Sequence, residues 1–133
     1  MSFSVNESTF RSTVLDSDLP VLVHFWAPWC GLCKMIMPLL NHFHSEWEGH
    51  IQLVDINADQ NLKLANAYRL STLPTLLLFD QGEIRHRLDS FRGKDDLRLT
   101  LDTMMQSQAL IYAEMPRLVQ VYPQASGANR FGV

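Results

Sequence analysis

The chain has 133 residues, of which 47% are hydrophobic, and a formal net charge of −3 at pH 7. This length predicts a domain with a real hydrophobic core, because typical domains have about 100–150 residues. The acidic balance, without a basic stripe, argues against a nucleic-acid-binding protein. No apolar stretch approaches the roughly 20 residues of a membrane span, and the first residues do not resemble a secretory signal. We therefore expect a cytoplasmic protein that binds neither nucleic acid nor membrane.

The first part of the chain predicts a strand, a short helix and a second strand. An edge strand is expected at 3–5 and a helix over 6–16, where apolar residues recur at helical spacing. Residues 21–26 form a nearly continuous apolar run with one histidine, His24. Such a run is typical of a central strand that is covered on both faces.

The second predicted helix starts near the two cysteines and has one apolar face. The residues of that face are Ile36, Leu39, Leu40, Phe43 and Trp47. Pro38 removes a backbone donor inside this helix and is expected to bend it. Gly49 is expected to end it.

The remaining elements alternate in a way that predicts an α/β fold. In chain order we expect a strand at 51–57, then a helix that Asp59 or Asn61 caps and that runs to about Tyr68. A strand at 75–79, a hairpin turn at 80–83 and a strand at 84–88 follow. The last helix follows Gly93 and has Leu97, Leu101, Met104 and Met105 on one face. Strands that alternate with helices predict a central sheet with helices on both sides. We place the domain over 1–106 and an extension over 107–133.

The two cysteines, Cys30 and Cys33, stand between the predicted strand at 21–26 and the following helix. In a reducing compartment this spacing indicates redox chemistry rather than a structural disulfide. A helix N-terminus stabilises a thiolate through its unpaired N–H groups and its dipole. We therefore expect Cys30 to be the nucleophile and Cys33 the resolving thiol. The alternatives are inert thiols or half of a metal site, although a closed zinc site needs four ligands and His42 and His44 lie on different helix faces.

The segment Trp26-Ala27-Pro28-Trp29-Cys30-Gly31-Leu32-Cys33-Lys34 resembles the thioredoxin family, especially its bacterial and chloroplast m-type members. The similarity runs without gaps from about Val5 to Met105. It includes Lys34-Met35-Ile36 with Pro38, Asp59-Gln60-Asn61 and Leu73-Pro74-Thr75-Leu76-Leu77-Leu78-Phe79. The resemblance implies a three-layer α/β/α thioredoxin fold, with a mixed sheet of four to five strands and four helices. It also implies a protein-disulfide reductase that acts on target proteins, with no cofactor other than its own redox-active disulfide.

A second protein must reduce the disulfide of such a protein again, because the chain carries no nucleotide-binding glycine loop or other cofactor motif. The resemblance implies a thioredoxin reductase of the flavin or ferredoxin-linked type. It also implies a cis peptide before Pro74, whose loop lies beside the cysteines and holds an extended substrate segment; a trans proline that ends the loop is the alternative. We expect Trp29, Gly31, Leu73, Pro74 and Ser90 to bind the substrate protein.

Leu32 is the first departure from the family pattern, because the family usually has proline at this position. A leucine restores an N–H group close to the sulfurs. We expect the dithiol–disulfide couple to be more oxidising than the roughly −270 mV of thioredoxin. The alternative is a tolerated substitution with little effect.

His24 and Asp55 form the second departure. The family usually has a buried aspartate at the position of His24 and often a lysine at the position of Asp55, so the acid–base pair is exchanged. We hypothesise that His24 assists deprotonation of Cys33 and that Asp55 is its partner, because histidine is the usual general base near neutral pH. The alternative is a buried histidine that only satisfies a hydrogen bond.

Ser90 is the third departure, because it takes the place of a glycine that keeps the substrate groove open. With Asp89 before it and Phe91 after it, Ser90 is expected to change which partner proteins bind, unless the loop simply shifts.

The extension 107–133 has three possible roles: it packs on the domain, forms a dimer contact, or covers part of the groove. Its end is expected to be a flexible tail. The alternative function is a binding or regulatory module with a specialised partner.

Overall fold

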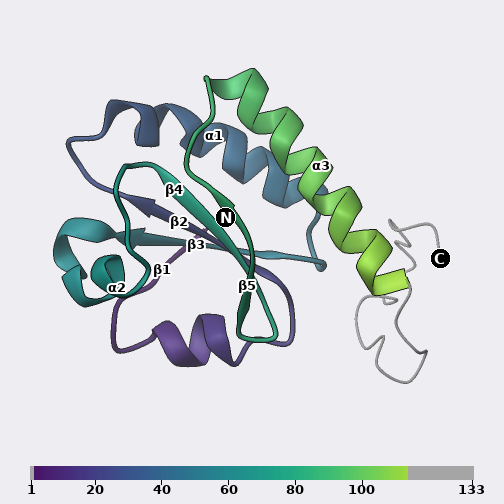
Figure 1. The fold of residues 1–133 in the computed structure, drawn as a ribbon, viewed down its shortest axis with the longest axis horizontal. Coiled ribbons are helices and arrows are strands. Elements are labelled where there is room, and N and C mark those ends of the chain that lie inside the picture. Colours follow the sequence, from purple (N-terminus) through teal and green to yellow (C-terminus); the bar gives the residue numbers. More distant parts are fainter. Residues whose placement is uncertain (1, 114–133) are drawn as a thin grey trace. The chain divides into compact units, whose positions relative to one another are not determined.

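The computed structural model describes residues 2–113, with side chains through residue 108. The chain forms a first unit that ends at Ser90 and a second that begins at Phe91. The first unit contains a five-stranded sheet in the order β1-β3-β2-β4-β5 (Figure 1). Its strands span β1 Phe3–Ser4, β2 Val21–Trp26, β3 Gln52–Asn57, β4 Thr75–Asp80 and β5 Glu83–Leu88. The sheet is mixed, because β1 and β2 pair with β3 in parallel, whereas β4 pairs antiparallel with β2 and β5.

Helical segments connect these strands. They are the π-helical turn η1 Arg11–Leu15, the helix α1 Gly31–Glu46, the 3₁₀ turn η2 Ala58–Gln60, the helix α2 Leu62–Ala67 and, in the second unit, the helix α3 Lys94–Ala113. The five-stranded mixed sheet with its helices confirms the expected α/β fold. Pro38 lies inside α1, as expected.

The first helix is shorter than the sequence predicts, and asparagine side chains form turns before η1 and at the start of η2. The Asn6 Oδ1 atom accepts the N–H groups of Ser8 and Thr9 at 2.9 and 3.1 Å. The Asn57 Oδ1 atom accepts the N–H groups of Asp59 and Gln60 at 2.9 and 3.2 Å. Such bonds replace the first turn of a regular helix, so the helix predicted over 6–16 is reduced to η1. The helix α2 follows η2 and keeps the predicted limits, because Asn61 is its N-cap and Tyr68 its C-cap.

The hairpin between β4 and β5 follows the expected turn chemistry. Asp80 pairs with Glu83, and the two residues between them, Gln81 and Gly82, have φ angles of +55° and +80°. Positive φ at both central positions defines a primed turn, whose twist matches that of the strands. The turn thereby fixes the pairing of β5 with β4.

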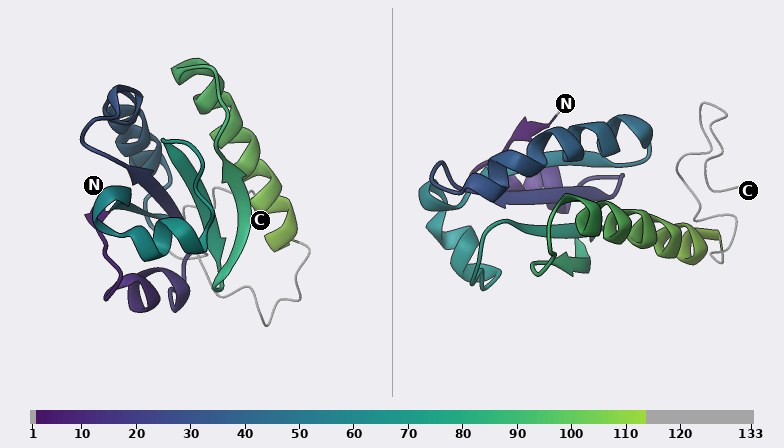
Figure 2. Two further views of the ribbon diagram at one scale, coloured as in Figure 1. Left: turned by 60° about the vertical axis from the view of Figure 1, so that its left-hand side comes forward. Right: turned by 90° about the horizontal axis from the view of Figure 1, so that it is seen from above.

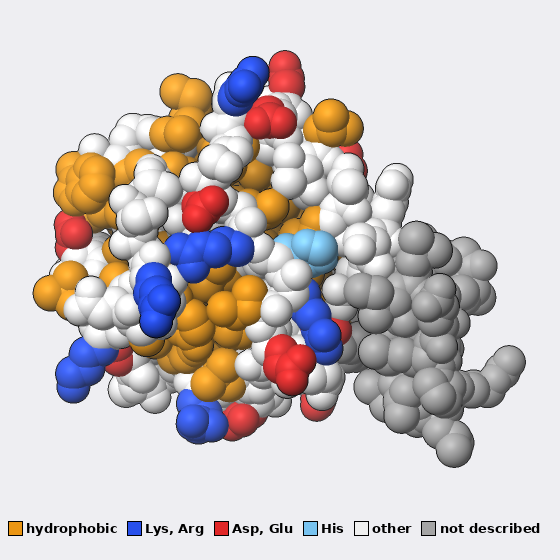
Figure 3. All heavy atoms as spheres, in the orientation of Figure 1, with side chains coloured by type: hydrophobic (Ala, Val, Ile, Leu, Met, Phe, Trp, Pro, Cys, Tyr) orange, Lys and Arg blue, Asp and Glu red, His pale blue; other side chains and the backbone are white. Residues whose placement is uncertain are grey.

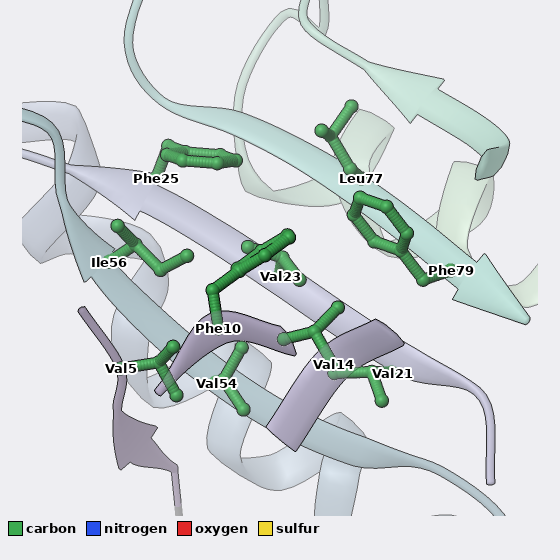
Figure 4. Packing of buried hydrophobic residues seen from close by; sticks show 10 residues of the cluster. All are labelled: Val5, Phe10, Val14, Val21, Val23, Phe25, Val54, Ile56, Leu77 and Phe79. Atoms are coloured by element: carbon green, nitrogen blue, oxygen red, sulfur yellow. The ribbon is translucent and has the colours of Figure 1, made fainter. Parts of the chain in front are cut away.

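The hydrophobic core of the first unit covers one face of its sheet (Figure 4). Ten buried residues form this cluster: Val5, Phe10, Val14, Val21, Val23, Phe25, Val54, Ile56, Leu77 and Phe79. η1 contributes Val14, while Leu64 of α2 packs at the edge of the cluster. α1 lies on the opposite face (Figure 2), where its residue Leu40 lines a small cavity together with Leu53 and Asp55 of β3. The sheet is therefore covered on both sides within this unit.

In the second unit, the four residues predicted to share one face of α3 are buried: Leu97, Leu101, Met104 and Met105. On the face seen in Figure 3, acidic and basic side chains are interspersed. No helix within the described residues is long and apolar enough to cross a bilayer. Most of the extension, residues 114–133, lies outside the described residues, so the boundary at 106 and the uses of 107–133 stay predictions.

Candidate functional site

The two cysteines lie where β2 leads into α1. They form a disulfide, with their Cα atoms 5.3 Å apart. Cys30 is the N-cap residue of α1, and its Sγ atom accepts the N–H group of Cys33 at 3.1 Å. Such a bond and the helix dipole stabilise negative charge on the Cys30 sulfur once the disulfide is reduced. Cys30 retains 6% exposure and Cys33 none, so Cys30 is the more exposed residue of the two.

The pairing of the strands brings four loops to the end of the sheet where the cysteines lie. Trp26, the last residue of β2, pairs with the last residue of β3, and Phe25 pairs with Thr75 at the start of β4. Leu88 at the end of β5 pairs with the second residue of β4. The Leu73–Pro74 loop and Ser90 therefore leave the sheet at this end. The Leu73–Pro74 peptide is cis, as expected.

Trp29 is an exposed indole ring that is held in place beside the disulfide loop. Its exposure is 69%, and its Nε1–H group donates to the Asp59 Oδ2 atom at 2.8 Å. Asp59 is itself fixed, because its N–H group donates to Asn57. Sequence reasoning considered Asp59 only as a helix cap and missed this contact. The triplet Asp59-Gln60-Asn61 is part of the family resemblance. Only the pairing of β2 with β3 shows that Asp59 contacts Trp29.

Gly31 and Ser90 are exposed residues at the same end of the sheet. A Cβ atom added at Gly31 would meet no atom within 4 Å, so the fold does not require glycine there. The absence of a side chain leaves the surface next to Cys30 open.

Arg87 fixes the chain just before Ser90. Its guanidinium donates to the carbonyl oxygens of Tyr68 and Arg69 at 2.7 and 2.9 Å, and to the Asp89 carboxylate at 3.0 Å. These bonds join the end of β5 to the segment that follows α2. Sequence reasoning missed Arg87, because two of its three partners are backbone carbonyl groups 18 and 19 positions away.

His24 and Asp55 lie side by side on neighbouring strands. They are direct partners in the register of β2 and β3, and His24 Nδ1 is 3.2 Å from Asp55 Oδ1. His24 is fully buried, whereas Asp55 is 20% exposed. His24 Nε2 is buried and has no hydrogen-bond partner within the described residues. The structure therefore brings together the two residues that the resemblance paired.

The pair faces α1, whose first turn carries Cys33. Directly paired residues on parallel strands point to the same side of a sheet, and Asp55 lines a small cavity together with Leu40 of α1. His24 stands two residues before the end of β2, and α1 is the next helix along the chain. One further contact was not predicted: the Ser2 hydroxyl donates to Asp55 Oδ2. Only the pairing of β1 with β3 reveals it.

Within residues 2–113, no group of three or more His, Cys, Asp or Glu side chains could hold a metal ion. His42 instead contacts Glu46 one helical turn away, with Nε2 and Oε2 3.3 Å apart.

Comparison with known proteins gives consistent matches. A family model described as Thioredoxin matches residues 1–103. Thioredoxin 1 of Nostoc sp. is 47% identical over 79 residues, which cover 59% of this chain and 74% of that protein. The thioredoxin of Synechocystis sp. is 43% identical over 101 residues, and that of Porphyra purpurea 42% over 101 residues; each alignment covers 74% of this chain and 92% of the relative.

Proposed function

The chain belongs to the thioredoxin family and is a thiol–disulfide oxidoreductase with protein-disulfide reductase activity, and we propose that Cys30 and Cys33 perform this reaction as nucleophile and resolving thiol. The observation that carries the assignment is the Cys33 N–H group on the Cys30 sulfur at the N-terminus of α1. This bond favours the thiolate of Cys30, which is the attacking species in disulfide exchange. The greater accessibility of Cys30 supports the same order of attack.

The reaction then proceeds in two exchange steps. The Cys30 thiolate attacks one sulfur of a target disulfide and forms a mixed disulfide, and the other target sulfur leaves as a thiolate and takes a proton. Cys33 loses its proton and attacks the Cys30 sulfur, which releases the second target thiolate and closes the Cys30–Cys33 disulfide. Two electrons pass from the cysteine pair to the target. A thioredoxin reductase of the flavin or ferredoxin-linked type returns them, with no cofactor bound to this chain, in the cytoplasm.

His24 is proposed to accept the Cys33 proton, with Asp55 as its partner. The support is the 3.2 Å contact between Nδ1 and the Asp55 carboxylate, which leaves Nε2 as the nitrogen without a partner in the described part of the chain. A carboxylate that holds one ring nitrogen fixes the tautomer and the orientation of the other. A buried ring nitrogen without a partner in the described residues calls for an explanation, and proton exchange with Cys33 supplies one.

Trp29, Gly31, Leu73, Pro74 and Ser90 are proposed to bind the substrate protein. The exposed and anchored indole ring of Trp29 offers a rigid contact surface, and such rings are common in binding hot spots. The strand register that gathers the other four residues supports the same assignment.

The alternative is a binding or regulatory module with a specialised partner and little general reductase activity. The observation that favours it is the fixed end of β5, where Arg87 holds Asp89 before Ser90. Such a loop would select one partner, since its shape is set before binding.

The two functions are distinguished by turnover with insulin, whose chains are joined by disulfides, in the presence of excess dithiothreitol. We expect the unmodified protein to accelerate insulin reduction, and Cys30→Ser and Cys33→Ser to abolish the acceleration. Equal rates for the protein and both variants would reject the reductase assignment in favour of the binding module. His24→Ala tests the base separately and is expected to slow the attack by Cys33 about 100-fold, at the low end of general base effects.

A further inference from the structure

A hydrogen-bonded chain connects the buried ring of His24 to the protein surface. His24 Nδ1 contacts Asp55 Oδ1 at 3.2 Å, and the other carboxylate oxygen, Oδ2, accepts the Ser2 hydroxyl. His24 is fully buried, but Asp55 is 20% exposed. The carboxylate is therefore the point where the buried pair meets solvent.

The exposed side of Asp55 opens on a small cavity of about 30 Å³. Its wall is formed by Ser2, Met37, Leu40, Asn41, Leu53 and Asp55. This volume has room for a water molecule, which needs roughly 10–15 Å³. Three of the lining side chains carry polar atoms with which a water could hydrogen-bond. Of the described residues in the wall, Asp55 alone carries a charge.

The edge strand β1 and the residues on either side of it hold both the backbone and the side chain of Asp55. Ser4 is paired with Asp55 in the register of β1 and β3, and the Val5 N–H group donates to the Asp55 carbonyl oxygen at 2.9 Å. The Ser2 hydroxyl holds the side chain of the same residue. With Oδ2 held, the rotation of the carboxylate is restricted and Oδ1 stays directed at His24.

We propose that His24, Asp55 and the cavity beside it form a proton relay to solvent, in which Ser2 is the positioning residue for Asp55. The relay rests on the proposed role of His24 as the base for Cys33, and it adds the path by which the proton leaves the buried site. It also gives the segment that begins with Ser2 and leads into β1 a function in the reaction, although this segment lies outside the disulfide loop.

The proton balance follows the two halves of the cycle. As Cys33 attacks, its proton moves to His24 Nε2, the Nδ1 proton moves to Asp55, and Asp55 releases a proton to water in the cavity. One proton reaches solvent and the ring changes tautomer. When the reductase returns two electrons to the disulfide, a proton enters by the reverse route, restores the Cys33 thiol and resets the ring.

The test separates the two attacks by stopped-flow reaction of the reduced protein with limiting Ellman's reagent. The first thiolate released reports attack by Cys30, and the second reports attack by Cys33. We expect Ser2→Ala to slow the second phase about 10-fold, the effect of losing roughly one charge-assisted hydrogen bond, and to leave the first phase unchanged. Ser2→Thr, which keeps the hydroxyl, is expected to restore the rate. Ser4→Ala is the matched control, because Ser4 is a serine two residues from Ser2 with an exposed side chain.

The outcomes distinguish the relay from the base. If Ser2→Ala matches Ser4→Ala while His24→Ala slows the second phase, the relay is rejected and the base stands. If His24→Ala also retains the normal second phase, both are rejected. If Ser2→Thr is as slow as Ser2→Ala, the hydroxyl is not the positioning group and the proposal fails. Asn41→Leu, which fills the cavity wall with an apolar group, is expected to slow the second phase, and an unchanged rate would reject the cavity as the exit. Thermal unfolding of each variant checks that the fold is retained.

Discussion

Replacing His24 by leucine is expected to make the protein more stable and less active. The substitution removes a buried Nε2 atom that has no partner within the described residues, and such an atom costs about 1–3 kcal/mol. It also removes the bond to Asp55, a net loss of about 0.5–1.5 kcal/mol. In the variant, Asp55 stays partly hydrated at 20% exposure and keeps its bond to Ser2, so its carboxylate is still solvated and hydrogen-bonded.

The balance favours the leucine variant, because a buried leucine side chain also contributes about 1.5–3 kcal/mol of hydrophobic stabilisation, part of which the imidazole already provides. We expect a net gain of about 1–2 kcal/mol and a rise in melting temperature of roughly 4 °C per kcal/mol. The second phase with Ellman's reagent is expected to slow by about 100-fold or more. The gain in stability and the loss of activity then have the same cause, which is the removal of the buried His24 Nε2 atom.

Chemical and thermal unfolding of the oxidised protein measures the stability change. Leu22→Ala is the control, since Leu22 is buried on the same strand and on the same face, and its truncation is expected to cost about 2–5 kcal/mol. A loss of more than about 1 kcal/mol for His24→Leu, on the scale of a buried hydrogen bond, would show that the ring is a structural element and would refute the reasoning.

Three further predictions concern the active-site turn, the indole ring and the response to pH. A redox titration should give a potential above about −270 mV, and Leu32→Pro should lower it; a value at or below that figure for the unmodified protein removes the role assigned to Leu32. Asp59→Ala should raise KM for insulin about 5-fold through loss of roughly one hydrogen bond to Trp29, with the first Ellman phase unchanged; an unchanged KM would contradict the anchoring role. Burial lowers the pKa of His44 and of His86, so stability is full above about pH 6.5 and falls as the pH is lowered through that value. Urea unfolding of the double variant His44→Gln, His86→Gln should show a smaller fall, and an equal fall would contradict the assignment.

Much of the fold could be predicted from the sequence because its signals are local. The apolar run at 21–26, the turn at 80–83 and the cysteine spacing each specify a strand, a hairpin or a helix start within a few residues, and the structure has all three. The helix over 6–16 was predicted too long, because the competing bonds from the Asn6 side chain were not recognised.

The candidate site could be predicted only in part, because several of its contacts join distant segments. The pairing of His24 with Asp55 followed from the family positions. The bond of Trp29 to Asp59 and that of Ser2 to Asp55 span 30 and 53 residues. Their existence depends on which strands are neighbours and in what register, and periodicity does not determine either.

The most direct test of the central claim is to trap the intermediate on Cys30. Reduced Cys33→Ser is mixed with insulin, excess thiol is blocked, and the products are analysed by mass spectrometry without reduction. We predict a covalent adduct whose disulfide maps to Cys30, formed because the serine cannot resolve it, and no adduct with Cys30→Ser. An adduct that forms equally with Cys30→Ser, or with neither variant, would contradict the assignment of Cys30 as the nucleophile.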